Sequence, residues 1–157
     1  MNGRVIHLKI LNINNMRIAS FDVGSKNLSF VILDDKKIIS WHNLNVSSSN
    51  SVCESLVYEL DKYIEIFNTC MHIVIEKQPS KNNKMRIIEG LLNAYFVIKG
   101  KCSNESNVSK VVVYSAKHKL NAMIKNNKDF NGKEGYTNRK KLSVKIAENY
   151  LHENETQ

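Results

Sequence analysis

The sequence predicts an α/β fold in which helices flank a mixed five-stranded sheet. Five short stretches rich in β-branched and aromatic residues, separated by turn residues, have the pattern of strands. Between the later stretches, apolar residues recur every three or four positions, which is the spacing of an amphipathic helix. With 157 residues, 42% of them hydrophobic, the chain has the length of one domain with a substantial core.

The first three predicted strands are residues 17–23, 28–34 and 38–45. Gly24 and Ser25 make a tight turn after the first strand, and the polar run Asp34-Asp35-Lys36-Lys37 makes the second turn. Consecutive strands joined by such short turns pair antiparallel. We therefore expect these three strands to form a meander.

A helix and a fourth strand follow the meander. Ser51-Val-Cys-Glu54 matches a capping box, which opens a helix. One apolar stripe then predicts a single helix through residue 67: Val52, Leu56, Leu60, Ile64 and Phe67. Strand 72–76 comes next, and Pro79 ends it. Because a helix connects them, we expect this strand to join the sheet of the meander.

The remaining elements alternate between helices and one more strand. Residues 85–99 predict a helix with these residues facing inward: Met85, Ile88, Leu92, Tyr95 and Phe96. A polar loop over 101–109 leads to a fifth strand at 111–114 and a short helix at 116–124. Residues 126–138, rich in Asn, Lys and Gly, predict an irregular segment before a last helix at 139–151.

The charge favours an anionic partner. The formal net charge is +8 and the isoelectric point is about 9.4, which is typical of nucleic-acid-binding proteins. Residues 117–145 hold nine basic residues against Asp129 and Glu134, at positions 117, 119, 125, 128, 133, 139, 140, 141 and 145. The alternative is a solvated basic face, which is the ordinary role of a charge run.

The same composition predicts a protein of a reducing compartment that does not cross a membrane. Cys53, Cys70 and Cys102 are odd in number and match neither a disulfide framework nor a zinc signature. No apolar run reaches the length of a membrane span, and the first fifteen residues lack a signal-peptide pattern. We expect residues 1–15 to be an N-terminal extension and residues 16–157 to form the domain.

Two acidic residues end apolar strands. Asp22 closes the first strand, and Glu76 holds the equivalent place on strand 72–76. An unpaired buried carboxylate is costly, so acids at such positions make sense if they face a metal ion or a phosphate. Two carboxylates on neighbouring strands could hold Mg²⁺. The alternatives are that Asp22 caps a turn and that Glu76 pairs with Lys77.

The order and spacing of four motifs resemble the poxvirus Holliday junction resolvases, which belong to the RuvC-like group with an RNase H-like fold. The motifs are Ile18-Ala-Ser-Phe-Asp-Val-Gly-Ser-Lys-Asn-Leu, Ile73-Val-Ile-Glu-Lys-Gln-Pro, Tyr114-Ser-Ala-Lys-His-Lys and Asn138-Arg-Lys-Lys-Leu. The resemblance covers about residues 17–151. The resemblance implies an RNase H-like domain whose metal-binding acids correspond to Asp22 and Glu76.

The resemblance also implies a Mg²⁺-dependent endonuclease that nicks four-way DNA junctions, with two metal ions per site that Mn²⁺ could replace. The family uses a lysine near the scissile phosphate; Lys141 is the first candidate, followed by Lys140 and Lys119. The expected DNA-binding residues are Lys26, Lys117, Lys119, Arg139, Lys140, Lys141 and Lys145. The expected setting is DNA recombination, repair and concatemer resolution by a homodimer in the cytoplasm of an infected host cell.

One family feature is not found. The family completes its metal site with an Asp-x-x-Asp pair that opens a helix after the basic helix, whereas this sequence ends Leu151-His-Glu-Asn-Glu-Thr-Gln. We therefore expect a domain without its C-terminal acidic helix, either because the sequence is truncated or because the site is incomplete. A junction-binding module without catalysis is an alternative.

An ATP-binding fold of the actin and sugar-kinase type is a second alternative. Such folds also place Asp-x-Gly-Ser after a first strand, and Asp22-Val-Gly-Ser25 fits that pattern. They need two lobes, however, and this chain has the length of one.

Overall fold

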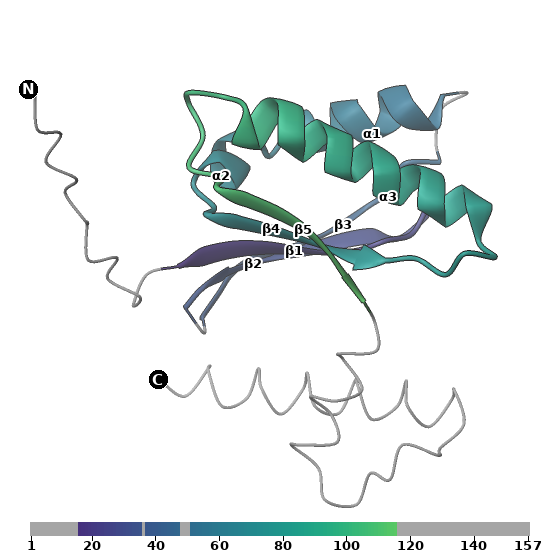
Figure 1. Ribbon diagram of the computed structural model, residues 1–157, viewed down its shortest axis with the longest axis horizontal. Helices are drawn as coiled ribbons and strands as arrows, with labels where there is room; N and C mark the ends of the chain where they lie inside the picture. Colours follow the sequence, from purple (N-terminus) through teal and green to yellow (C-terminus); the bar gives the residue numbers. More distant parts are fainter. Residues whose placement is uncertain (1–15, 36, 48–50, 116–157) are drawn as a thin grey trace, which may run out of the picture.

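The computed structural model describes residues 16–35, 37–47 and 51–115, which build one five-stranded sheet in the order β3-β2-β1-β4-β5 (Figure 1). The strands are β1 (Arg17–Asp22), β2 (Leu28–Asp34), β3 (Lys37–Leu44), β4 (His72–Lys77) and β5 (Lys110–Ser115). All five predicted strands are therefore present, with bounds within one residue or two of the predicted ones.

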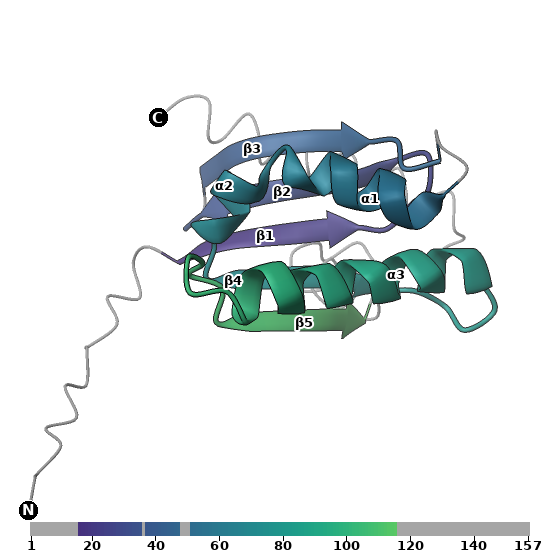
Figure 2. The same cartoon turned by 90° about the horizontal axis from the view of Figure 1, so that it is seen from above.

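The sheet is mixed. β1 pairs antiparallel with β2, and β2 pairs antiparallel with β3, which confirms the meander. On its other edge β1 pairs parallel with β4, and β4 pairs parallel with β5. Seen from above, the arrows of β1 and β5 point in the same direction (Figure 2). The connection through helices predicted that β4 joins the sheet, and the register places it directly beside β1.

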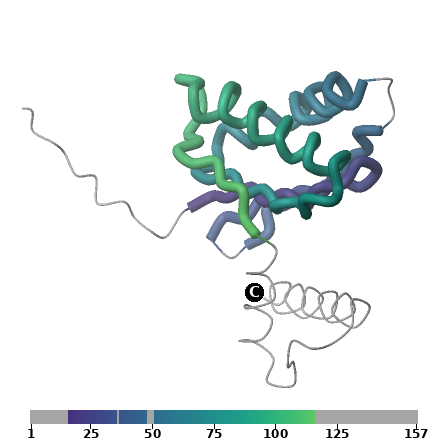
Figure 3. The backbone as a smooth tube through the Cα atoms, turned by 45° about the vertical axis from the view of Figure 1, so that its right-hand side comes forward, coloured from purple at the N-terminus to yellow at the C-terminus, as the bar shows by residue number. Residues whose placement is uncertain are grey.

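All described helices lie over one face of the sheet (Figures 1 and 3). They are α1 (Val52–Asp61), α2 (Ile64–Asn68), α3 (Asn83–Tyr95) and the π-helical segment η2 (Phe96–Lys101). The predicted N-cap is present, since the Ser51 hydroxyl accepts a 3.3 Å hydrogen bond from the Glu54 backbone N–H. The predicted helices at 116–124 and 139–151 lie outside the described residues.

The prediction of one helix through residue 67 is wrong. α1 ends at Asp61, and α2 starts again at Ile64. Tyr63 lies at the break, where its ring contacts those of His42 and Phe30 at centroid distances of 4.5 and 5.1 Å. The break turns Tyr63 onto the sheet while Phe67 stays buried, so the apolar stripe continues across two helices.

The core lies between this helical layer and the sheet. Phe21, Phe30, Phe67 and Phe96 form a cluster of contacting rings with centroids 4.9 to 5.6 Å apart. Burying each such ring contributes about 2–3 kcal/mol. Because successive side chains of a strand alternate between faces, the residues between these buried positions lie on the opposite face. In the described part of the chain, no helix covers that opposite face (Figure 3).

None of the described helices is long and apolar enough to cross a membrane.

Candidate metal centre

The register of β1 and β4 brings Asp22 and Glu76 to the same end of the sheet. The last paired residues of the two strands are Phe21 and Ile75, and Asp22 and Glu76 are the next residues along. Phe21 and Ile75 are buried beneath the helices. The alternation along each strand therefore puts both carboxylates on the open face, at the carboxyl ends of two parallel strands.

Strand pairing aligns one polar residue from each of the five strands in a row that includes the two acids. Ser29 of β2 pairs with Asp22, and Asn43 of β3 pairs with Ser29. On the other side Tyr114 of β5 pairs with Glu76. Residues paired across a sheet share a face, so the two acids lie in the middle of a row that ends in Asn43 and Tyr114. We call these five residues the polar row.

The turn that follows Asp22 is tightly built. A Cβ added to Gly24 would lie 2.6 Å from the Asn27 carbonyl oxygen, so a side chain there would force the turn open. The Val46 N–H donates a 3.0 Å hydrogen bond to the Ser25 carbonyl, and Val46 itself is fully buried. The chain after β3 thus anchors the turn that carries Asp22. Lys26 is exposed in this turn.

Two hydrogen bonds fix the backbone directly after Glu76. The Gln78 side-chain amide donates to the Glu76 carbonyl at 3.2 Å. The Gln78 backbone N–H donates to Oε2 of Glu89, on α3, at 2.6 Å. Sequence reasoning missed Glu89 because nothing in its spacing sets it apart from other helical acids. Only the packing of α3 over β4 reveals its partner.

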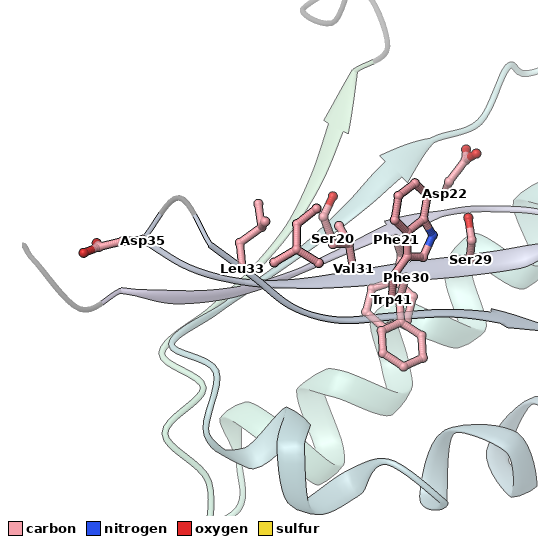
Figure 4. A pocket seen from close by; sticks show the side chains of 10 residues that line it. Ser20, Phe21, Asp22, Ser29, Phe30, Val31, Leu33, Asp35 and Trp41 are labelled. Carbon is pink, nitrogen blue, oxygen red and sulfur yellow. The ribbon is translucent and has the colours of Figure 1, made fainter. Parts of the chain in front are cut away.

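A cavity of about 600 Å³ opens beside Asp22 on the open face (Figure 4). Its lining mixes hydroxyl and carboxylate groups with apolar side chains: Ser20, Phe21, Asp22, Ser29, Phe30, Val31, Leu33, Asp35, Ile38 and Trp41. The Trp41 side chain is 57% exposed, an unusual state for tryptophan. The cavity leaves Asp22 accessible, so a ligand can approach this carboxylate from the open face.

Among the solved structures that match this fold are two complexes with a Holliday junction, whereas no protein-family model and no curated protein matches the sequence. One is Fowlpox virus resolvase in complex with its substrate Holliday junction DNA, with a TM-score of 0.53 and 26% identity over 83% of this chain and 72% of that chain. The other is T. thermophilus RuvC in complex with a Holliday junction substrate, with a TM-score of 0.53 and 14% identity over 69% of each chain.

The fold of this chain is similar to that of the RuvC-like resolvases. The resemblance to the poxvirus members of this group, and the RNase H-like sheet that it implies, are thereby confirmed. Asp22 and Glu76 are the carboxylates that β1 and β4 of this resolvase-like sheet bring together.

The donor set fits a hard divalent cation. Carboxylate and hydroxyl oxygens are available from Asp22, Glu76 and the neighbouring Ser29, and Mg²⁺ in proteins is commonly held by one or two carboxylates plus water. Within residues 16–35, 37–47 and 51–115, no three His, Cys, Asp or Glu side chains gather closely enough to hold a metal ion. The described part of this candidate site therefore offers two carboxylates, those of Asp22 and Glu76.

Most of the basic residues expected from the sequence lie beyond this part of the structure. Lys26 is described, and it is exposed at the site end of the sheet. The other candidates lie outside the described residues: Lys117, Lys119, Arg139, Lys140, Lys141 and Lys145.

Proposed function

We propose that this protein is a Mg²⁺-dependent endonuclease that resolves four-way DNA junctions. The observation that carries the proposal is the β1–β4 register, which places Asp22 beside Glu76 at the carboxyl ends of parallel strands in a RuvC-like fold. Two structures of this fold contain Holliday junction DNA, and the net charge of +8 suits a polyanionic substrate.

In this proposal Asp22 and Glu76 hold the metal ions through their carboxylate oxygens. Divalent ions held this way supply an activated water for attack on phosphorus and stabilise the leaving oxygen. Ser29, beside Asp22 in the polar row, has a hydroxyl that can bind a metal-bound water or a phosphate oxygen. Mn²⁺ would substitute for Mg²⁺ because it accepts the same oxygen donors.

A fixed lysine would stabilise the charge that develops on the phosphate in the transition state. Lys141 remains our first candidate, with Lys140 and Lys119 after it. The remaining cations would bind the DNA backbone, namely Lys26, Lys117, Arg139 and Lys145. Contacts of this kind position the DNA without reading its sequence.

A second copy of the chain is the proposed protein partner, because a two-fold junction that is nicked symmetrically needs two related sites. The helical layer offers an apolar surface away from the open face. Between α1 and α3 lies a groove of about 250 Å³, lined by Cys53, Leu56, Val57, Leu91, Ala94, Tyr95, Ile98 and Lys99. Ile98, which is 66% exposed, adds apolar surface at this groove that a second copy could cover. We call this surface the helical groove.

The proposed setting is the cytoplasm of an infected host cell, where the enzyme would act in recombination, repair and the resolution of concatemeric genomes. The likeness to Fowlpox virus resolvase supports a viral setting. All three cysteines are free thiols, as a reducing compartment would keep them.

The test is cleavage of a synthetic four-way junction compared with linear duplex of the same sequence. We expect Mg²⁺-dependent paired nicks in the junction at protein concentrations that leave the duplex intact. Asp22→Asn should lower the cleavage rate by more than about 100-fold, because losing a metal ligand costs more than losing a residue that only supports one. Junction binding without metal should persist.

Glu65→Gln is the matched control, since it removes one negative charge from an exposed position on α2. This variant should cleave at the wild-type rate. An Asp22→Asn protein that cleaves normally would refute the metal-site assignment. Tight binding of the junction with no cleavage by the wild type would instead favour the junction-binding module.

A further inference from the structure

The carboxylate of Glu89 connects helix α3 to the exit of strand β4. Its Oε2 accepts a hydrogen bond of 2.6 Å from the backbone N–H of Gln78, eleven residues earlier in the chain. Such a short bond to an ionised carboxylate is charge-assisted and stronger than a bond between neutral groups. Glu89 is therefore a fixed link between the helical layer and the residue two positions after Glu76.

The link lies close to the point where the two registers of β4 end. Pairing with β1 stops at Ile75, whereas pairing with β5 continues through Lys77. Asp22 therefore lies where the paired register of β1 and β4 has just ended, while β4 still follows β5. Pro79 follows and has no N–H to donate, so the Gln78 N–H is the last backbone donor before the proline. The Glu89 carboxylate accepts the hydrogen bond from this N–H.

The helix that presents Glu89 is itself held firmly. Ile88, its neighbour in sequence, is fully buried, and so is Leu92 one turn later. The Asn82 side chain caps the start of α3 by accepting a 3.3 Å hydrogen bond from the Met85 N–H. A carboxylate on a rigid, capped helix can hold a strand end in place more closely than one on a loop.

We propose that Glu89 is a positioning residue for the metal centre. By holding the Gln78 N–H, and with the Gln78 amide bonded to the Glu76 carbonyl, it sets the path of the backbone and so the place of the Glu76 carboxylate beside Asp22. Glu89 does not touch the metal or the DNA in this role. The inference rests on the proposed nuclease function, and it adds α3 to the elements that build the site.

Three variants separate this role from a general effect on folding. Glu89→Leu keeps the size and helix propensity but removes the acceptor, whereas Glu89→Gln keeps an acceptor oxygen. Glu59→Leu is the control, because it removes a helical glutamate of similar burial whose partner is the surface residue Lys62. Cleavage, metal dependence, junction binding and amide exchange would be measured for all of them.

We expect Glu89→Leu to lower kcat by about 10- to 100-fold and to raise the Mg²⁺ concentration for half-maximal rate, as the loss of ligand-supporting hydrogen bonds typically does. Its Kd for the junction in the absence of metal should match that of the wild type. Glu89→Gln should recover most of the rate, and Glu59→Leu should behave as the wild type.

Amide hydrogen exchange at Gln78 gives a readout that does not need catalysis. The Gln78 N–H should exchange slowly in the wild type and in Glu59→Leu, and fast in Glu89→Leu. Fast exchange in the wild type would overturn the inference, as would a Glu89→Leu protein with unchanged kcat and Mg²⁺ dependence. If wild-type protein with a protected Gln78 N–H fails to cleave junctions, the proposed function fails while the Glu89–Gln78 link stands.

Discussion

At the scale of single residues, Cys70 differs from the other two cysteines. Cys53 and Cys102 are exposed, whereas Cys70 is fully buried and its thiol points to the Ile66 carbonyl at 3.5 Å. Burial disfavours the charged thiolate and raises the pKa of Cys70 from 9.0 to about 11. The folded protein therefore keeps this proton at pH values where the unfolded chain loses it.

This pKa difference predicts a loss of stability at alkaline pH. Between about pH 9 and 11 the unfolded state binds fewer protons at Cys70 than the folded state, so the free energy of unfolding falls as pH rises. Urea unfolding at pH 8 and at pH 10 should show a larger decrease in the free energy of unfolding for the wild type than for Cys70→Ala. Cys53→Ala is the control, and its drop should equal that of the wild type. Equal drops in all three proteins would contradict the prediction.

The residues of the site were predictable to different degrees. Asp22 and Glu76 stand out in the sequence because each is an acid at the end of an apolar strand, a place with no structural use for a charge. Ser29 and Glu89 carry no such signal. Ser29 reaches the site through the β1–β2 register, and Glu89 reaches it through the packing of α3 on β4. A single sequence does not show which distant segments come into contact, so these two residues could not be predicted.

At the scale of elements, a partly buried hydrogen bond joins α3 to α1. The Tyr95 hydroxyl donates to Oδ1 of Asp61 at 2.6 Å, and Nζ of Lys99 lies 3.9 Å from the same oxygen. Burial of the ring and this bond to Asp61 both raise the pKa of Tyr95. Tyr95 also packs edge-on against Phe96, at a centroid distance of 5.1 Å, so the bond lies where the helices meet the core.

Tyr95→Phe should therefore destabilise the fold by about 1 kcal/mol. The expected cost is below the roughly 1.5–3 kcal/mol of a bond to a charged group because Asp61 is partly exposed and water can replace its partner. Tyr58→Phe removes a hydroxyl from an exposed tyrosine on α1 and should change stability by less than about 0.5 kcal/mol. Chemical denaturation of the two variants measures both changes in the free energy of unfolding. Equal effects would show that the Tyr95 hydroxyl does not link the helices.

The existence of the elements followed from the sequence, whereas some of their ends did not. The Ser51 cap and the strand periodicities are local signals, and the structure confirms them. The break before Ile64 and the change to π-helical geometry at Phe96 keep Tyr63 and Phe96 in contact with core rings. Tertiary packing overrides helical periodicity at the first of these points, so the periodicity merged α1 and α2 into one helix. The second predicted helix, 85–99, is present, since the chain stays helical from Asn83 through Lys101.

At the scale of the whole molecule, the order of the strands brings residues from separate sequence motifs together at one end of the sheet. The meander and the connection through helices predict that β4 joins the sheet, and placing it beside β1 puts Asp22 next to Glu76. The polar row depends on a register of five strands, and a shift of one residue would move Asp22 to the core face. The sequence therefore indicates the two acids and the fold class, but only the paired strands reveal the row around them.

The two faces of the molecule have different proposed partners, and this predicts how dimer formation can be separated from catalysis. The open face holds Asp22 and the polar row for DNA, whereas the helical groove, with Ile98 at its edge, is proposed to bind a second copy. Ile98→Glu places a charge in the groove and should weaken dimerisation by about 2 kcal/mol or more, which is about thirtyfold.

Ile39→Glu is the matched control, because it adds the same charge at a residue of β3 that is 47% exposed and lies outside the groove. Analytical ultracentrifugation should show a dimer for the wild type and for this control, and a monomer for Ile98→Glu at the same concentration. The monomer keeps Asp22 and Glu76 intact, so it should give single unpaired nicks instead of paired ones. A dimeric Ile98→Glu protein that still nicks in pairs would place the interface elsewhere on the molecule.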